Sequence, residues 1–208
     1  MSTTSGKSQR PRQSPIENLR ASKNLASSYR LARGKTASKQ TQSLQPTGKE
    51  NDMLIYGIDP GYTGAISLYW TKTGRLECYD MPTMKNPKGK TLINLHELLR
   101  ILSNEADESC LAVVERVSAM PGQGVSSTFR FGQGYGQIEM GIAACKLPIQ
   151  YVSPAVWKKH FGLNRDKGVS RGLVTQRLPQ YAHLFARVKD DGRAEATLIA
   201  LYAAEKLI

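Results

Sequence analysis

Acidic residues stand at the ends of two apolar runs and at the opening of a later helical segment. Asp59 and Glu115 each close a run that is apolar enough for a buried strand. Asp191 and Glu195 are four residues apart, a spacing that places both side chains on one face of a helix. Magnesium prefers carboxylate oxygens, and two ions about 4 Å apart stabilise the attacking and leaving oxygens of phosphodiester cleavage. Convergence of the four acids would therefore indicate metal-dependent cleavage of a nucleic-acid backbone.

Each acid taken singly has a simpler explanation. Asp191 and Glu195 open a helix, where acidic side chains complement the positive end of the helix dipole. Glu115 alone is well explained as a surface residue. The prediction of a metal site therefore depends on all four carboxylates meeting in the folded chain.

The elements that would position these acids follow from apolar periodicity and turn residues. A meander of three strands is followed by a basic Pro/Gly loop, and two further strands alternate with helices before a helical C-terminal part. This order predicts an α/β fold with a mixed five-stranded sheet flanked by helices. The strands are expected at Met53–Asp59, Ala65–Trp70, Leu76–Met81, Leu111–Glu115 and Ile149–Val152, the loop at Pro82–Gly89, and the helices around Leu92–Leu102, Ser126–Ala144, Trp157–Leu163, Lys167–Arg177 and Ala194–Leu207.

The N-terminal segment differs in composition from the rest of the chain. The formal charge is +12, and Met1 to Glu50 contains ten Lys or Arg against two acids. Few large apolar residues occur there, so we expect residues 1–51 to form a disordered basic tail and 52–208 a folded domain. A weak amphipathic pattern between Ile16 and Arg33 fits a transit peptide, a DNA-tethering arm or a tail without a dedicated role. The excess of positive charge predicts a polyanionic partner.

Several other chemistries lack their motifs. No run of about eighteen apolar residues occurs, so neither a membrane span nor a membrane partner is expected. The three cysteines lie far apart without zinc-binding spacing and are expected to be buried, reduced thiols. The three histidines lack HxxxH or Cys partners, and Ser126 and Ser127 lack a nucleophile-elbow context. Zinc chemistry and covalent hydrolase chemistry are therefore not expected.

Several spaced motifs resemble those of RuvC-type Holliday junction resolvases, with the closest likeness to the monokaryotic chloroplast resolvases and their bacterial and phage relatives. The likeness covers Leu54–Tyr202, so that residues 52–208 resemble a RuvC-like nuclease domain. Several motifs in the right order are more specific than any one of them. The motifs are Gly57–Gly64 on the first strand, Val113–Val117 on the second acidic strand, Ala119–Gly132, Val152–Lys159 and Lys189–Ala196.

This resemblance implies a ribonuclease H-like fold and a homodimer that makes paired symmetrical nicks in DNA four-way junctions. It implies two Mg²⁺ ions for each active site, with Mn²⁺ able to substitute, and no small-molecule cofactor. Asp59, Glu115, Asp191 and Glu195 match metal-binding catalytic positions, and Lys167 matches a catalytic lysine beside the scissile phosphate. Asp191 stands where a histidine is common and Glu195 where aspartate is common. In a eukaryote the implied location is the plastid nucleoid, and otherwise the cytoplasm.

A second set of residues is expected to contact DNA. Aromatic residues interleaved with a cation in the glycine-rich stretch Pro121–Gly136 can stack on unpaired bases, at about 1–3 kcal/mol for each base. Phe129 and Phe131 are equally well explained as core residues, and the basic residues that follow can bind the DNA backbone or face solvent. By resemblance, the glycine-rich stretch enters the junction. The expected DNA-binding residues are Met120, Gln123, Phe129, Arg130, Phe131, Gln133, Tyr135, Lys158, Lys159 and Arg171.

Two other functions remain open. The segment Asp59–Gly64 also resembles the first phosphate loop of actin-like and sugar-kinase-like phosphotransferases, although the chain is short for the two domains that those proteins need. A non-catalytic junction-binding or nucleoid protein would keep the fold without cleavage. Carboxylates at all four acidic positions favour an active enzyme.

Overall fold

A computed structural model describes residues 52–105, 109–118, 122, 124–163 and 167–208. The predicted tail at 1–51 lies outside the described residues, so the tail and its boundary stay predictions. Met120 and Gln123 also lie outside them, and only the backbone of Lys167 is described.

Five strands form one mixed sheet. They are β1 (Leu54–Asp59), β2 (Ala65–Trp70), β3 (Leu76–Asp80), β6 (Cys110–Glu115) and β7 (Ile149–Val152). Their order is β3-β2-β1-β6-β7, with β2 antiparallel to β1 and β3, and β6 parallel to β1 and β7. The predicted fold class is confirmed: a meander joined to two parallel strands is the ribonuclease H-like arrangement.

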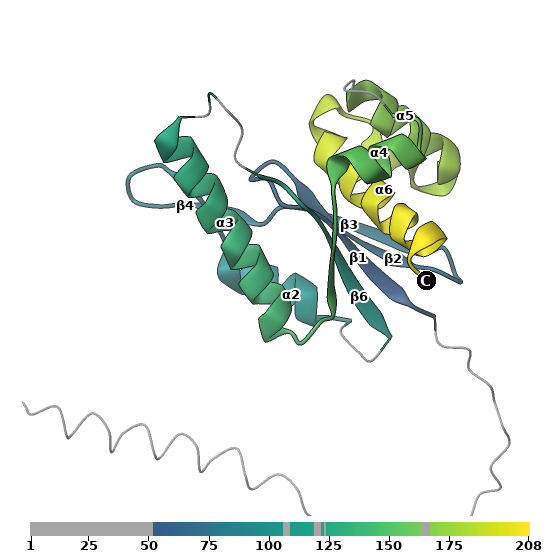
Figure 1. Ribbon diagram of the computed structural model, residues 1–208, viewed down its shortest axis with the longest axis horizontal. Coiled ribbons are helices and arrows are strands. Elements are labelled where there is room, and N and C mark those ends of the chain that lie inside the picture. Colours follow the sequence, from purple (N-terminus) through teal and green to yellow (C-terminus); the bar gives the residue numbers. More distant parts are fainter. Residues whose placement is uncertain (1–51, 106–108, 119–121, 123, 164–166) are drawn as a thin grey trace, which may run out of the picture. The chain divides into compact units, whose positions relative to one another are not determined.

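Helices cover both faces of this sheet (Figure 1). On one face lie α2 (Leu95–Ser103) and α3 (Val125–Ala144), and on the other α4 (Pro154–His160), α5 (Lys167–Arg177) and α6 (Asp191–Lys206). Side chains of a strand point alternately to its two faces. Accordingly, Tyr56 and Ile58 of β1 belong to the core beneath α2 and α3, whereas Ile55 belongs to the core beneath α4, α5 and α6.

Helix α6 approaches the central strand β1 more closely than side chains of ordinary size would permit. A Cβ atom at Gly57 would lie 2.1 Å from the carbonyl oxygen of Ala196, and one at Gly192 would lie 2.6 Å from that of Thr63. The Ser67 hydroxyl of β2 donates a hydrogen bond to the Ala196 oxygen at 2.9 Å. The first turns of α6 are thereby held against the end of β1 that carries the acidic residue.

Two segments differ from the sequence-based expectation. The basic Pro/Gly loop contains a small hairpin of β4 (Thr83–Lys85) and β5 (Thr91–Ile93). Helix α2 begins after this hairpin, at Leu95, because the Asn94 side chain accepts a hydrogen bond from the Glu97 backbone amide and caps the helix there. The last helix begins at Asp191, ahead of the expected Ala194, because Gly192 and Arg193 hide its first turn from apolar periodicity.

Two further predictions from the sequence concern membrane spans and the state of the cysteines. Within the described residues, every helix is too short or too polar to cross a bilayer. All three cysteines are free, and Cys110 is buried as expected, but Cys78 and Cys145 are partly exposed. Burial of the Cys78 thiol raises its pKa to about 11, so this thiol stays protonated at neutral pH.

Candidate active site

Asp59 and Glu115 lie side by side at the ends of neighbouring parallel strands. In the register of β1 and β6, Ile58 faces Val114, which makes the two acids the next facing pair. Both point to the face that α6 covers, since Val113, two residues before Glu115, packs in the core on that side. Glu115 is 7% exposed. The sheet therefore brings two carboxylates together on one face.

Helix α6 carries the other two acids to the same strand end. Asp191 and Asp59 line one cavity of about 380 Å³. Glu195 lies one helical turn further along and is 8% exposed. The start of α6 is fixed by Asp190, which accepts hydrogen bonds from the backbone and guanidinium of Arg187. The Arg187 guanidinium holds the pKa of the Asp190 carboxyl below its usual range, so this anchor stays charged at neutral pH.

Two adjacent residues of helix α4 donate hydrogen bonds to two of the four candidate metal-binding acids. The fully buried Trp157 donates a hydrogen bond from Nε1 to Oε1 of Glu115 at 2.9 Å. Lys158 Nζ donates to Oε1 of Glu195 at 3.2 Å. Because neighbouring residues of one short helix bind the two carboxylates, Glu115 and Glu195 lie in the same neighbourhood.

Helix α5 binds the acid at the start of α6. Arg171 Nε donates to Oδ1 of Asp191 at 2.7 Å, and the two side chains are 22% and 19% exposed. Partial burial makes such a pair less screened by solvent than an open surface pair. Lys167 opens the same helix, and its predicted place beside a scissile phosphate stays a prediction because its side chain lies outside the described residues.

The four acids thus come from three elements that converge, but they do not form a closed ligand set. Asp59 adjoins Glu115 in the sheet, α4 connects Glu115 to Glu195, and Asp191 shares a cavity with Asp59. In the described part of the chain, no three His, Cys, Asp or Glu side chains are placed so that they could hold a metal ion. Convergence of the elements is shown, whereas a metal site is not.

The donor chemistry nevertheless fits a hard divalent cation. The four carboxylates offer oxygen ligands of the type that Mg²⁺ prefers. Asp59 and Asp191 line the cavity together with Asp80 and Lys189, and no thiol or imidazole is among its described lining residues. Two of the carboxylates, Glu195 and Asp191, are turned toward Lys158 and Arg171. Metal ligation by these two acids requires that they rotate away from their cationic partners.

Comparison with solved structures finds similar folds that include two structures of RuvC from Thermus thermophilus. The first, "T. thermophilus RuvC in complex with Holliday junction substrate", is 18% identical, covers 73% of this chain and 92% of that chain, and has a TM-score of 0.43. The second, "Thermus thermophilus RuvC structure", is 15% identical, covers 74% of this chain and 96% of that chain, and has a TM-score of 0.47.

No protein-family profile and no curated protein matches the chain. At identities of 18% and 15%, with TM-scores of 0.43 and 0.47, the two structural matches assign no chemistry to this chain. Any function proposed for this chain therefore rests on its own residues and on their arrangement.

The predicted base-stacking residues lie along the first half of α3. Phe129 is 73% exposed, so it is not a core residue. Phe131 is partly buried, with its ring centroid 6.3 Å from that of Tyr135. Burial raises the pKa of Tyr135 to about 12, which keeps its ring uncharged. Gln133 and Lys159 are exposed, and contact of these residues with DNA stays a prediction.

Three functional contacts escaped the sequence-based prediction. Trp157 looked like an ordinary apolar helix residue, yet its indole N–H needs an acceptor when buried and finds Glu115. Arg130 donates from Nη2 to the Thr91 carbonyl at 3.0 Å, and its contact with DNA stays a prediction. Tyr62 donates its hydroxyl proton to the Arg130 carbonyl at 2.9 Å and also lines the cavity of Asp59. These contacts join α4, α3 and β5 to the candidate site.

Proposed function

We propose that this chain is a divalent-metal-dependent DNA endonuclease that resolves four-way junctions. The observation that carries the proposal is the cavity shared by Asp59 and Asp191, at the strand end where Glu115 and Glu195 also gather. The RuvC-like sequence motifs supply the substrate class, and the net charge of +12 suits a polyanionic substrate.

In this proposal Asp59, Glu115, Asp191 and Glu195 would hold two Mg²⁺ ions, which would supply Lewis-acid activation of the phosphodiester and of the attacking water. The protein's own contribution is placement. The buried Trp157 fixes the orientation of Glu115 through its hydrogen bond and excludes water from the inner side of that carboxylate. The close contact of α6 with β1 sets the separation of the other acids from the sheet.

One observation favours a second candidate, a junction-binding protein without cleavage. Glu195 and Asp191 form ion pairs with Lys158 and Arg171, and a protein that had lost its metal would keep such pairs. The two candidates share a substrate but differ in their need for a metal ion.

A gel assay separates the two candidates. We expect paired symmetrical nicks in a synthetic four-way junction with Mg²⁺, no nicks with EDTA, and far less cleavage of linear duplex or single strand. Junction binding in EDTA should persist, because exposed cations and not the metal ions provide most of the affinity. Binding without cleavage in Mg²⁺ would favour the non-catalytic protein, and cleavage in EDTA would exclude a metal mechanism.

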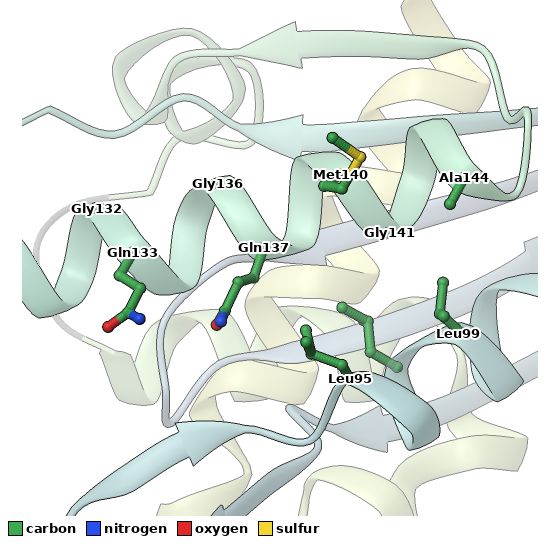
Figure 2. A pocket seen from close by; sticks show the side chains of 10 residues that line it. Leu95, Leu99, Gly132, Gln133, Gly136, Gln137, Met140, Gly141 and Ala144 are labelled. Atoms are coloured by element: carbon green, nitrogen blue, oxygen red, sulfur yellow. The ribbon is translucent and has the colours of Figure 1, made fainter. Parts of the chain in front are cut away.

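We further propose that two copies associate through the groove between α2 and α3. Paired symmetrical cuts need two active sites, whereas the described residues contain one set of converging acids. The groove has a volume of about 360 Å³ and is lined by Leu95 and Leu99 of α2 and by Gln137 and Met140 of α3. Figure 2 shows the Gln137 side chain extending from α3 toward α2. Leu95, Leu99 and Met140 are 44%, 38% and 68% exposed, an apolar surface that a second copy would cover.

Replacing Met140 with arginine should convert the dimer to a monomer, because a charge would be buried without a partner at the centre of the interface. Sedimentation equilibrium measures the mass. The matched control is Val156→Arg on α4, which changes a 48% exposed apolar residue away from the groove and should leave the dimer intact. A dimer that survives Met140→Arg places the interface elsewhere.

A further inference from the structure

The hairpin of β4 and β5 carries a concentrated positive charge that the candidate site does not use. Its residues Thr83–Ile93 include Lys85, Lys88 and Lys90 and no acidic residue. All three lysines are exposed, and the partner resolved for their side chains is neutral: Lys85 Nζ donates to Thr91 Oγ1 at 2.6 Å. The hairpin thus presents three cations to solvent on a short segment.

The turn of the hairpin has a defined conformation. The Asn86 side chain accepts hydrogen bonds from the backbone amides of Lys88 and Lys90, both at 2.9 Å. The backbone N–H of Asn86 in turn donates to the Lys90 carbonyl at 2.9 Å. A segment ordered in this way loses little conformational entropy when it binds a ligand.

The hairpin is also anchored to the candidate active site. A hairpin of two strands is marginal by itself in water, so its anchors matter. Arg130 of α3 donates to the Thr91 carbonyl at 3.0 Å, and its own carbonyl accepts from Tyr62, which lines the cavity of Asp59. Thr83, at the base of β4, lines the same cavity. Figure 1 shows the hairpin beside the N-terminal half of α3.

We propose that this hairpin is a second DNA-binding element, which holds the phosphate backbone of a duplex arm that leaves the cleavage site. The inference rests on the proposed function. Lysines bind phosphates as point charges without reading sequence, which suits an arm of variable sequence. From Thr83 to Lys88 the chain can extend roughly 15–20 Å at about 3.3 Å per residue. At about 3.4 Å per base pair along the helix axis, the lysines meet phosphates on the order of five base pairs from the cavity.

The test is the salt dependence of junction binding by the full chain, measured in EDTA so that no cleavage occurs. Each phosphate contact contributes about 0.9 to the slope of log K against log salt concentration. In the variant Lys85→Gln, Lys88→Gln, Lys90→Gln we expect the slope to fall by about 2–3 and affinity at low salt to fall by about tenfold or more. The corresponding triple Lys→Arg variant should bind as the wild type does. Thermal unfolding should be unchanged in both variants, since the lysines are exposed.

The matched control is a second triple Lys→Gln variant, which removes three positive charges at the end of the sheet opposite to Asp59. The affinity of this control for the junction should fall by no more than about threefold, because its three lysines lie away from the cavity. Equal losses in the two glutamine variants, or an unchanged slope in the hairpin variant, would overturn the proposal while wild-type junction binding keeps the proposed function intact. Failure of the wild type to bind any DNA would overturn both. The control substitutions are Lys72→Gln after β2, Lys146→Gln after α3 and Lys206→Gln at the end of α6.

Discussion

Replacing Asp59 with asparagine is expected to slow the nicking of a four-way junction in Mg²⁺ by about 1,000-fold or more. Asparagine keeps the size of the side chain but removes the negative charge that a hard cation requires. Loss of several kcal/mol of transition-state stabilisation by the metal corresponds to about three decades in rate. Junction binding should stay within a few-fold, because Asp59 is neither on the basic hairpin nor among the exposed residues of α3. Single-turnover cleavage and binding in EDTA measure the two effects separately.

The cavity itself supplies a matched control for this variant. Asp80 lines the same cavity, but its side chain is 60% exposed and accepts a hydrogen bond from Arg193 at 2.5 Å. Asp80→Asn makes the same chemical change at an acid outside the four, so cleavage should stay within a few-fold of wild type. Normal cleavage by Asp59→Asn would refute the catalytic assignment. Equal losses in both variants would mean that the general charge of the cavity, and not a specific ligand, supports the reaction.

Replacing Gly57 with alanine is expected to destabilise the fold by about 3 kcal/mol or more, although the substitution adds one methyl group. The new Cβ would lie 2.1 Å from the Ala196 oxygen and 2.9 Å from the Ala200 Cβ, so α6 would have to move away from β1. That movement would also separate the acids of α6 from those of the sheet. Urea unfolding measures the loss of stability, and cleavage at a temperature where the variant remains folded measures the separation.

A second alanine variant controls for the intrinsic effect of removing a glycine. Gly172 lies within α5, and a Cβ there would have no atom within 4 Å. Gly172→Ala should therefore stabilise the protein by about 0.5–1 kcal/mol, because alanine is the better helix former. If Gly57→Ala were equally harmless, the close packing of α6 on β1 would not be what positions the acids.

The sheet was predictable from sequence because its signals are local. Apolar runs that end on Asp59 and Glu115 predicted both strands, and the period of two along a strand then places the acids on one face. The spacing of Asp191 and Glu195 predicted a shared helix face in the same way. Strands and helix faces depend on periodicity within one segment, and a single sequence displays that directly.

Contacts between distant segments were not predictable in this way. The hydrogen bond from Trp157 to Glu115 joins residues on a helix and a strand, and no spacing in the sequence signals it. Arg130 stands among aromatic residues, which predicts a DNA contact, but no local pattern predicts its hydrogen bond to the Thr91 carbonyl. The hairpin of β4 and β5 was missed because its strands are short and contain polar residues, so neither shows a period of two.

The most direct test of convergence is an anomalous difference map from a crystal soaked in Mn²⁺. Mn²⁺ accepts the same oxygen ligands as Mg²⁺ and scatters anomalously, so its position identifies the ligands. We expect signal at the end of β1, bounded by Asp59 and Glu115 of the sheet and by Asp191 and Glu195 of α6, with the last two turned away from their basic partners. Signal confined to other places, with Lys158 and Arg171 still bound to those acids, would contradict a shared metal site.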